Sequence, residues 1–169
     1  MLTQPNINKV ESTGIITIDP FDFQPTEESV PLDLKNFLYQ GLIIQENHFK
    51  DQLAQVDWLT YHDKNVSIFC SVDTIIPPWT YMMLTSKLSN HAKSIYFGTN
   101  SDHNLLLWRE VIISERFNQY KDKKVVIKAH VGLDPSIFIA LSEQLMPFVK
   151  TLMYGEPGLP KVIWKSDHK

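Results

Sequence analysis

Five residues that could do chemistry lie at or just beyond the ends of buried strands predicted in this 169-residue chain. Cys70 and Ser71 end a run of apolar residues, and Asp73 comes two residues later. His130 ends a second apolar run, and Glu156 follows a third. Ligands of open parallel sheets bind beyond the carboxyl ends of the strands, so we expect these side chains to be neighbours there.

These residue types indicate metal binding or acid–base and nucleophilic chemistry. Thiolate, imidazole and carboxylate groups all ligate metal ions, and they also serve as nucleophiles, bases and acids. Cys70, Asp73 and His130 combine a soft sulfur with nitrogen and oxygen, which suits zinc or iron better than magnesium. Glu156 or water could complete a weak four-coordinate site.

Each of these residues also has a structural interpretation. A free cysteine such as Cys70 is most often a small buried hydrophobic residue, and Asp73 could cap a turn before the next helix. His130 could be a hydrogen-bonded structural residue, and Glu156 a solvated turn carboxylate. Both interpretations stay open from the residues alone.

The remaining histidines are expected in polar, solvated surroundings, and His103 in the first turn of a helix. They are His48, His62, His91, His103 and His168. Phosphate-binding and dinucleotide-binding glycine loops are missing from the sequence, as are C-x-x-C, H-E-x-x-H and G-x-S-x-G motifs. Nothing in the sequence therefore marks a nucleotide site or a familiar catalytic machinery.

Strand-like and helix-like segments alternate from residue 61 onward, which predicts an α/β fold. Near-continuous apolar strands separated by helices are typical of a parallel sheet covered on both faces, so we expect a three-layer sandwich with a mainly parallel sheet. The strands are expected at 66–71, 94–98, 125–130 and 151–155, with an edge strand at 161–164, and the helices at 77–91, 101–120 and 135–149.

Residues 1–60 are expected to form an N-terminal extension that packs on this main body. Short β-branched runs at 14–19 and 30–32 predict strands, and the apolar spacing of 45–56 predicts a helix. Asp33 is expected to cap a short helix between them.

The alternation contains an internal match between two segments. Residues 61–68 (YHDKNVSI) resemble residues 120–127 (YKDKKVVI). Further matches join Leu84, Leu88, Lys93 and Gly98 to Leu141, Leu145, Lys150 and Gly155. We interpret the chain as one domain, 1–169, with two duplicated βαβ units at 61–98 and 120–155, a connecting helix at 99–119 and a C-terminal tail at 156–169.

The amino-acid composition limits the classes of protein to which this chain can belong. The chain is 43% hydrophobic and 21% charged, with a formal net charge of −3, as expected for one soluble globular domain. This charge gives no basic field for nucleic acid or an anionic membrane. A single cysteine excludes an intrachain disulfide and suggests a reducing compartment. The sequence has no signal-peptide or membrane-helix pattern, so we expect a cytoplasmic location.

Several motifs resemble a bacterial family still classed as a domain of unknown function. They are F-C-S-V-D-T-I-I-P-P-W at 69–79, G-I-I-T-I-D at 14–19, D-L-K at 33–35, Q-G-L at 40–42, D-W at 57–58, K-K-V-V-I-K at 123–128 and Y-G-E-P at 154–157. The likeness extends over nearly the whole chain. Members of this family resemble proteins whose genes neighbour those of iron–sulfur cluster assembly. The resemblance therefore implies an accessory role with proteins of that assembly.

The resemblance also implies a thiolate-rich site that this chain does not keep complete. Typical members of the family have three cysteines, and Cys70 corresponds to the first of them. His130 stands where the second is expected, and Gly158 follows Gly-Glu-Pro where the third is expected. The three cysteines imply a metal or cluster site in the family. In this chain the site is either altered or decayed.

Three hypotheses about function follow. The first is a non-enzymatic cytosolic accessory protein that binds a ligand or partner, linked to metal or iron–sulfur handling. The second is a small metal- or thiol-dependent enzyme with Cys70 as ligand or nucleophile and His130 as base. The third is an interaction domain with a decayed site. The first is favoured because no recognised catalytic motif or complete ligand set is present.

Overall fold

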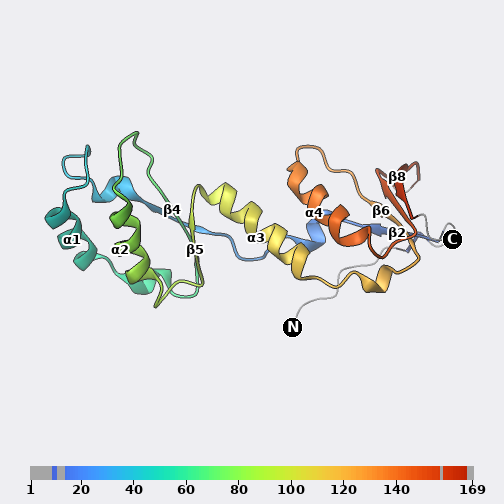
Figure 1. Cartoon of the computed structure of the whole chain (residues 1–169), viewed down its shortest axis with the longest axis horizontal. Helices are drawn as coiled ribbons and strands as arrows, with labels where there is room; N and C mark the ends of the chain where they lie inside the picture. The colour runs from blue at the N-terminus through green and yellow to red at the C-terminus, as the bar shows by residue number, and fades with distance from the viewer. Residues whose placement is uncertain (1–8, 11–13, 157, 167–169) are drawn as a thin grey trace. The chain divides into compact units, whose positions relative to one another are not determined.

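The chain divides into two compact units, each with a sheet of its own (Figure 1). The computed structural model describes residues 9–10, 14–156 and 158–166. Unit 1 takes its described residues from 1–25 and 105–169, and unit 2 comprises 26–104. The predicted α/β class with mostly parallel strands is confirmed, although the strands belong to two sheets where the sequence was interpreted as one.

The sheet of unit 1 has three parallel strands in the middle and an antiparallel strand at each edge. Helix α4 (Pro135–Leu145) connects β6 to β7, which gives the βαβ unit expected from the sequence. In sheet order the strands are β1 (Lys9–Val10), β2 (Ile15–Ile18), β6 (Lys124–Ile127), β7 (Thr151–Tyr154) and β8 (Lys161–Lys165).

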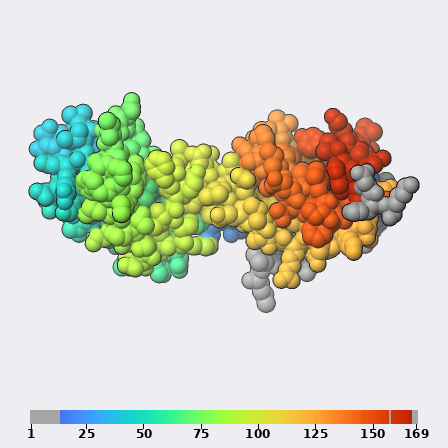
Figure 2. All heavy atoms as spheres, in the orientation of Figure 1, coloured from blue at the N-terminus to red at the C-terminus, as the bar shows by residue number. Residues whose placement is uncertain are grey.

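The sheet of unit 2 has three parallel strands, β3 (Val30–Asp33), β4 (Asn65–Phe69) and β5 (Ser94–Phe97). Helix α1 (Glu46–Gln55) lies between β3 and β4 in the chain, and α2 (Pro78–Leu88) connects β4 to β5. Residues of α2, green in Figure 2, reach the surface of unit 2. Helix α3 (Asn100–Ser114) begins in unit 2 and continues into unit 1.

The segment expected to be an N-terminal extension supplies the first parallel strand of each sheet, β2 to unit 1 and β3 to unit 2. Hydrophobic spacing located these short strands but carries no information about which strand each one pairs with. None of the described helices is long and apolar enough to span a membrane.

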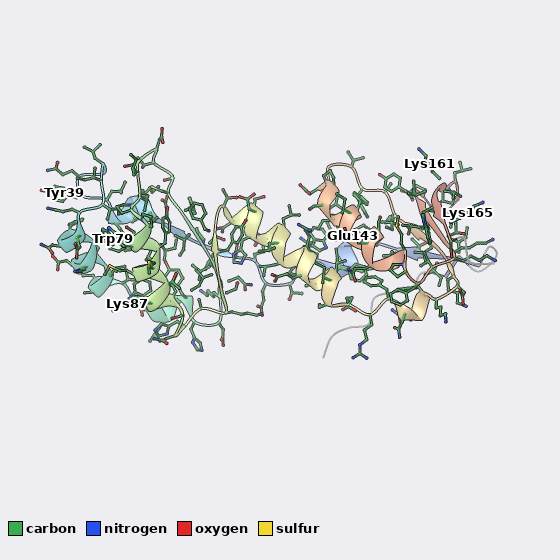
Figure 3. The ribbon with its side chains drawn as sticks, in the orientation of Figure 1. Tyr39, Trp79, Lys87, Glu143, Lys161 and Lys165 are labelled. Carbon is green, nitrogen blue, oxygen red and sulfur yellow. The ribbon has the colours of Figure 1, made fainter. Side chains whose placement is uncertain are left out.

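Each unit has its own hydrophobic core. Leu141 and Leu145 of α4 are fully buried in unit 1, and Leu84 and Leu88 of α2 are fully buried in unit 2. These leucines are the residues that the sequence match paired. Trp79 of α2, labelled in Figure 3, is partly buried and packs edge-on against Phe49 of the unit 2 core, at 5.7 Å between ring centroids.

The glycines matched in the sequence occupy the same backbone geometry after β5 and β7. The amide of Gly98 donates to the Ile68 carbonyl at 3.0 Å, and that of Gly155 donates to the Ile127 carbonyl at 3.1 Å. Their φ angles are 142° and 124°, in a region of backbone conformation that residues other than glycine rarely adopt. At Gly98 an added Cβ would lie 2.6 Å from the Tyr96 ring.

The matched aspartates before β4 and β6 are also equivalent. Asp63 and Asp122 have φ angles of 55° and 59°, in the left-handed region where aspartate is enriched. Their amides donate to the carbonyls of His91 and Phe148, both at 2.9 Å. This geometry explains why aspartate recurs in the two segments, while a common ancestry of the segments stays a prediction.

We predict that Leu84→Ala and Leu141→Ala each lower the free energy of unfolding by about 2–5 kcal/mol, because each leaves a cavity in a fully buried core. Urea denaturation followed by circular dichroism measures both changes. One shared transition, shifted by either variant, would support the expected single domain; two transitions, each shifted by one variant, would contradict it. No shift in either variant would contradict the assignment of the two cores.

Candidate functional site

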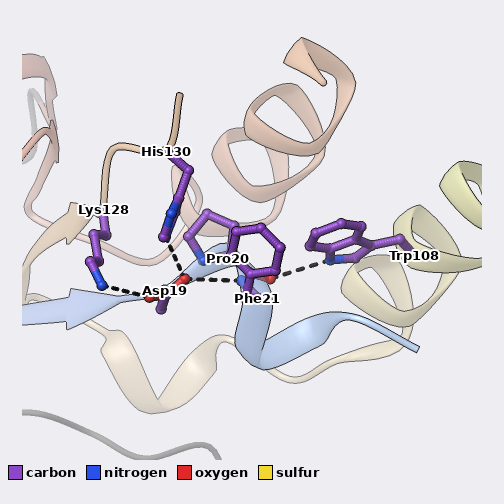
Figure 4. A network of polar contacts seen from close by, with 6 residues as sticks. All are labelled: Asp19, Pro20, Phe21, Trp108, Lys128 and His130. Carbon is purple, nitrogen blue, oxygen red and sulfur yellow. Dashed lines mark hydrogen bonds and ion pairs between the residues drawn. The ribbon is translucent and has the colours of Figure 1, made fainter. Parts of the chain in front are cut away.

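Asp19 holds together the strand-end residues of unit 1. It follows β2 directly and caps the 3₁₀ helix Pro20–Phe23, with its Oδ1 accepting from the Phe21 amide at 3.1 Å. The same oxygen lies 2.7 Å from His130 Nε2, and Oδ2 accepts from Lys128 Nζ at 3.0 Å. Figure 4 shows these three contacts converging on one carboxylate from two neighbouring strand ends.

These contacts determine the charge of the cluster. Burial raises the pKa of Asp19, but the hydrogen bonds from the Phe21 amide, Lys128 and His130 together outweigh it and hold the pKa below its usual value. The bond to Asp19 raises the pKa of Lys128, and the charge of Glu156 adds to this effect. Asp19 and Lys128 are therefore an ion pair at neutral pH, and the exposed Glu156 lies close enough to act on it.

His130 is mostly buried and packs against the ring of Phe21. Its side chain is 22% exposed, and Phe21 meets its ring edge-on at 4.7 Å between centroids. Trp108 packs on Phe21 and donates from Nε1 to the Pro20 carbonyl, which fixes the 3₁₀ helix (Figure 4). Within the described part of the chain, Asp19 is the hydrogen-bond partner of Nε2, and Nδ1 accepts or donates no hydrogen bond. An imidazole oriented in this way can act as a base or a ligand through Nδ1.

A second aspartate performs a similar task in unit 2. Asp33 ends β3, caps the 3₁₀ helix Leu34–Phe37 through the Lys35 amide at 3.0 Å, and accepts from the Ser71 amide at 3.0 Å. Burial raises the pKa of Asp33, but its hydrogen bonds with Ser71 and Lys35 lower it below the usual value. The loop after β4, which carries Cys70, is thereby tied to the end of β3.

This loop surrounds an open pocket of about 420 Å³ in unit 2. Cys70 is half-buried: it packs partly against the core of the unit and partly lines the pocket. Asp73 is exposed on the same loop and also lines the pocket. The complete lining consists of Cys70, Ser71, Val72, Asp73, Thr74, Ile76, Tyr81 and Phe97.

The surface beside the pocket is apolar and exposed. Ile75 is 90% exposed and Phe97 is 68% exposed, although both are large hydrophobic residues. The Thr74 hydroxyl donates to the Leu42 carbonyl at 2.7 Å, and Leu42 is itself 66% exposed. The pocket that contains the thiol is therefore bordered by side chains that favour contact with another molecule.

The five residues predicted from the sequence are distributed over the two units: Cys70, Ser71 and Asp73 in unit 2, and His130 and Glu156 in unit 1. Among the described residues, no three histidine, cysteine, aspartate or glutamate side chains cluster closely enough to hold a metal ion. The metal site of Cys70, Asp73 and His130 draws on both units and stays a prediction.

Sequence reasoning missed the two aspartates that organise the strand ends. Asp19 and Asp33 were recognised as the end of a strand and as a helix cap, but their contacts with the loops after β6 and β4 were not foreseen. Lys128 was missed as well, because a lysine at a strand end is ordinarily solvated. The available signal was that both aspartates end parallel strands, whose carboxyl ends meet at one edge.

The expectation of a solvated His103 is wrong. It is 2% exposed, and its two ring nitrogens lie 3.0 Å from the Ser67 hydroxyl and 3.1 Å from the Ser94 hydroxyl. Ser94 donates to Asn65, and the Tyr96 ring stacks on the imidazole at 5.0 Å. The polar residues inside the otherwise apolar strands β4 and β5 were the signal for this buried network.

Comparison with known protein families gives a match over nearly the whole chain. A family model described as a protein of unknown function, DUF2480, matches residues 4–166. The chain belongs to the DUF2480 family. This confirms the resemblance to a family of unknown function, while the cysteine pattern and the link to iron–sulfur assembly stay predictions. The search of the curated proteins and the search of the solved structures found no match.

We predict that Asp19→Asn lowers the free energy of unfolding by about 1–2 kcal/mol at pH 7, since it removes the carboxylate that accepts three hydrogen bonds. The pKa of Asp19 is lowered in the folded state, so its contribution to stability is present above the ordinary aspartate pKa of 3.8 and is lost as the pH falls through the folded-state pKa. Urea titrations at pH 7 and pH 3 measure the difference. A difference that does not change with pH would contradict the cluster.

Proposed function

We propose that this DUF2480 protein is a non-enzymatic cytoplasmic accessory protein that binds a partner or ligand at the strand-end surface of unit 2, in metal or iron–sulfur handling. The observation that carries the binding role is the open pocket at Cys70, bordered by the exposed apolar side chains of Ile75 and Phe97. Apolar side chains exposed together mark interaction sites more often than free surface. Proteins of iron–sulfur assembly are the proposed partners, and nucleic acid and membranes are not.

The donor set of this chain limits what Cys70 can hold. A cluster or structural zinc site needs four ligands, usually thiolates or imidazoles, and the chain supplies one thiol. No group of three ligating side chains forms among the described residues, so they do not fit a complete resident site. Cys70 therefore acts as a single soft ligand for zinc or iron that is weakly bound, with further ligands from the partner.

A competition titration with a chromophoric zinc chelator under anaerobic conditions tests this proposal. We expect Cys70→Ser to weaken Zn²⁺ binding at least about tenfold, because it replaces the soft sulfur ligand. The matched control is His130→Ala, which is expected to leave Zn²⁺ binding unchanged, because the proposal assigns Cys70 as the ligand from this chain. Equal weakening in both variants would support the combined site predicted from the sequence. Binding unaffected by Cys70→Ser would contradict a metal role for the thiol.

The second candidate is a small thiol-dependent enzyme with Cys70 as nucleophile and His130 as base. The 2.7 Å contact between Asp19 and His130 favours it, because a carboxylate that orients an imidazole is a common arrangement for a general base. The rate of Cys70 alkylation by iodoacetamide separates the two candidates. The binding protein retains its rate in His130→Ala, whereas an enzyme in which His130 activates the thiol loses at least tenfold.

A further inference from the structure

The two units differ at one edge of their sheets. The strand registers place Ile95 of β5 opposite Val66 and Leu152 of β7 opposite Val125, so β5 in unit 2 is the equivalent of β7 in unit 1. In unit 1, β8 pairs antiparallel with the outer edge of β7. In the described part of unit 2, β5 ends the sheet and its outer edge is free.

The free edge of β5 lacks the features that protect other edges. Natural sheets block edge pairing with proline or with charged side chains, above all lysine. The other free edge of unit 2, β3, carries the exposed Pro31, and β8 has a lysine at each end, Lys161 and Lys165 (Figure 3). Strand β5 reads Ser-Ile-Tyr-Phe, with neither proline nor charge.

Unit 1 shows what fills the space beside such an edge. Trp164 of β8 lies opposite Leu152 and packs against the core of unit 1. Residues directly opposite each other in an antiparallel pair share one face of the sheet, so Trp164 lies on the face that carries Leu152 and α4. The bulky side chain of the added strand thus completes this face of the core.

The equivalent place in unit 2 is an open groove of about 390 Å³ between β5 and α2. Its lining is mostly apolar and consists of Ile68, Tyr81, Thr85, Ile95, Tyr96 and Phe97. The aromatic pair at the end of the groove has a counterpart of similar geometry in unit 1. The ring centroids of Tyr81 and Phe97 lie 5.3 Å apart at 84°, and those of Phe138 and Tyr154 in unit 1 lie 5.5 Å apart at 81°. Strand β8, which lies beside the equivalent edge in unit 1, has no counterpart in the described part of unit 2.

We propose that the edge of β5 binds an extended peptide segment of a partner protein, which runs antiparallel to β5 and places a large apolar side chain opposite Ile95 in this groove. Main-chain pairing at a sheet edge gives affinity, and the pocket for alternate side chains gives specificity. The partner segment has the chemistry of β8: a short apolar strand that includes a tryptophan and has a lysine at each end.

The length of the edge favours a peptide over a second copy of this chain. Stable interfaces between folded proteins bury about 1,200–2,000 Å² in total. Pairing through the four residues of β5 falls well below that area, whereas a short peptide can use main-chain pairing and one filled groove. The inference goes beyond the proposed function because it does not require Cys70.

The probe for this site is a blocked synthetic peptide with the sequence of residues 159–166, Leu-Pro-Lys-Val-Ile-Trp-Lys-Ser. Added to the full-length ¹⁵N-labelled protein, it is expected to shift amide resonances of β5 and α2 in a saturable way at or below about 1 mM. A peptide with Trp164→Ala is expected to bind at least tenfold more weakly. Shifts confined to β7 would mean exchange with β8 and would overturn the proposal, as would no saturable binding.

Protein variants locate the site. Thr85→Lys fills the groove from its exposed rim and is expected to weaken peptide binding at least tenfold. Met82→Lys is the matched control, because Met82 is 73% exposed on the same helix and does not line the groove. Cys70→Ser keeps peptide binding, which separates this inference from the metal proposal. A concentration-dependent dimer that Phe97→Asp dissociates would assign the edge to a second copy and overturn the peptide.

Discussion

A carboxylate at the end of the first parallel strand organises the strand-end surface of each unit. Asp19 and Asp33 both cap the 3₁₀ helix that follows their own strand. Each also accepts a hydrogen bond from the loop after the neighbouring strand, from His130 in unit 1 and from the Ser71 amide in unit 2. One partly buried carboxylate thus fixes two chain segments, and the remaining groups at each strand end depend on that anchor.

The same anchor supports different chemistry in the two units. In unit 1 the loop after β6 brings Lys128 and His130 to Asp19, so this end is charged. In unit 2 the corresponding loop carries Cys70, Ser71 and exposed apolar residues, so this end offers a thiol and a hydrophobic rim. The outer edge also differs, since β8 completes the sheet of unit 1 and β5 stays unpaired in the described sheet of unit 2. The pocket at Cys70 and the unpaired edge of β5 both lie in unit 2.

The sequence predicted the elements well and their assembly less well. Apolar periodicity and proline signals placed helices α2 and α4 within a few residues of their observed bounds, because those signals are local. The division into two sheets was not predicted, since an apolar strand can pair with any neighbour of suitable length. Asp19 and His103 show the same limit: their roles depend on residues more than thirty positions away. The apolar runs predicted that Cys70 and His130 follow buried strands, but not that these two strands belong to different sheets.

The ring nitrogen of His130 that carries the proton tests the anchoring role of Asp19 most directly. An ionised Asp19 must accept from Nε2, since its oxygen lies 2.7 Å from that nitrogen and its pKa is lowered. Long-range ¹H–¹⁵N spectra of the side chain at pH 8 are predicted to show a proton on Nε2 that exchanges slowly and lies downfield, and its loss in Asp19→Ala. A proton on Nδ1, or an Nε2 proton that exchanges equally fast in both proteins, would contradict the account.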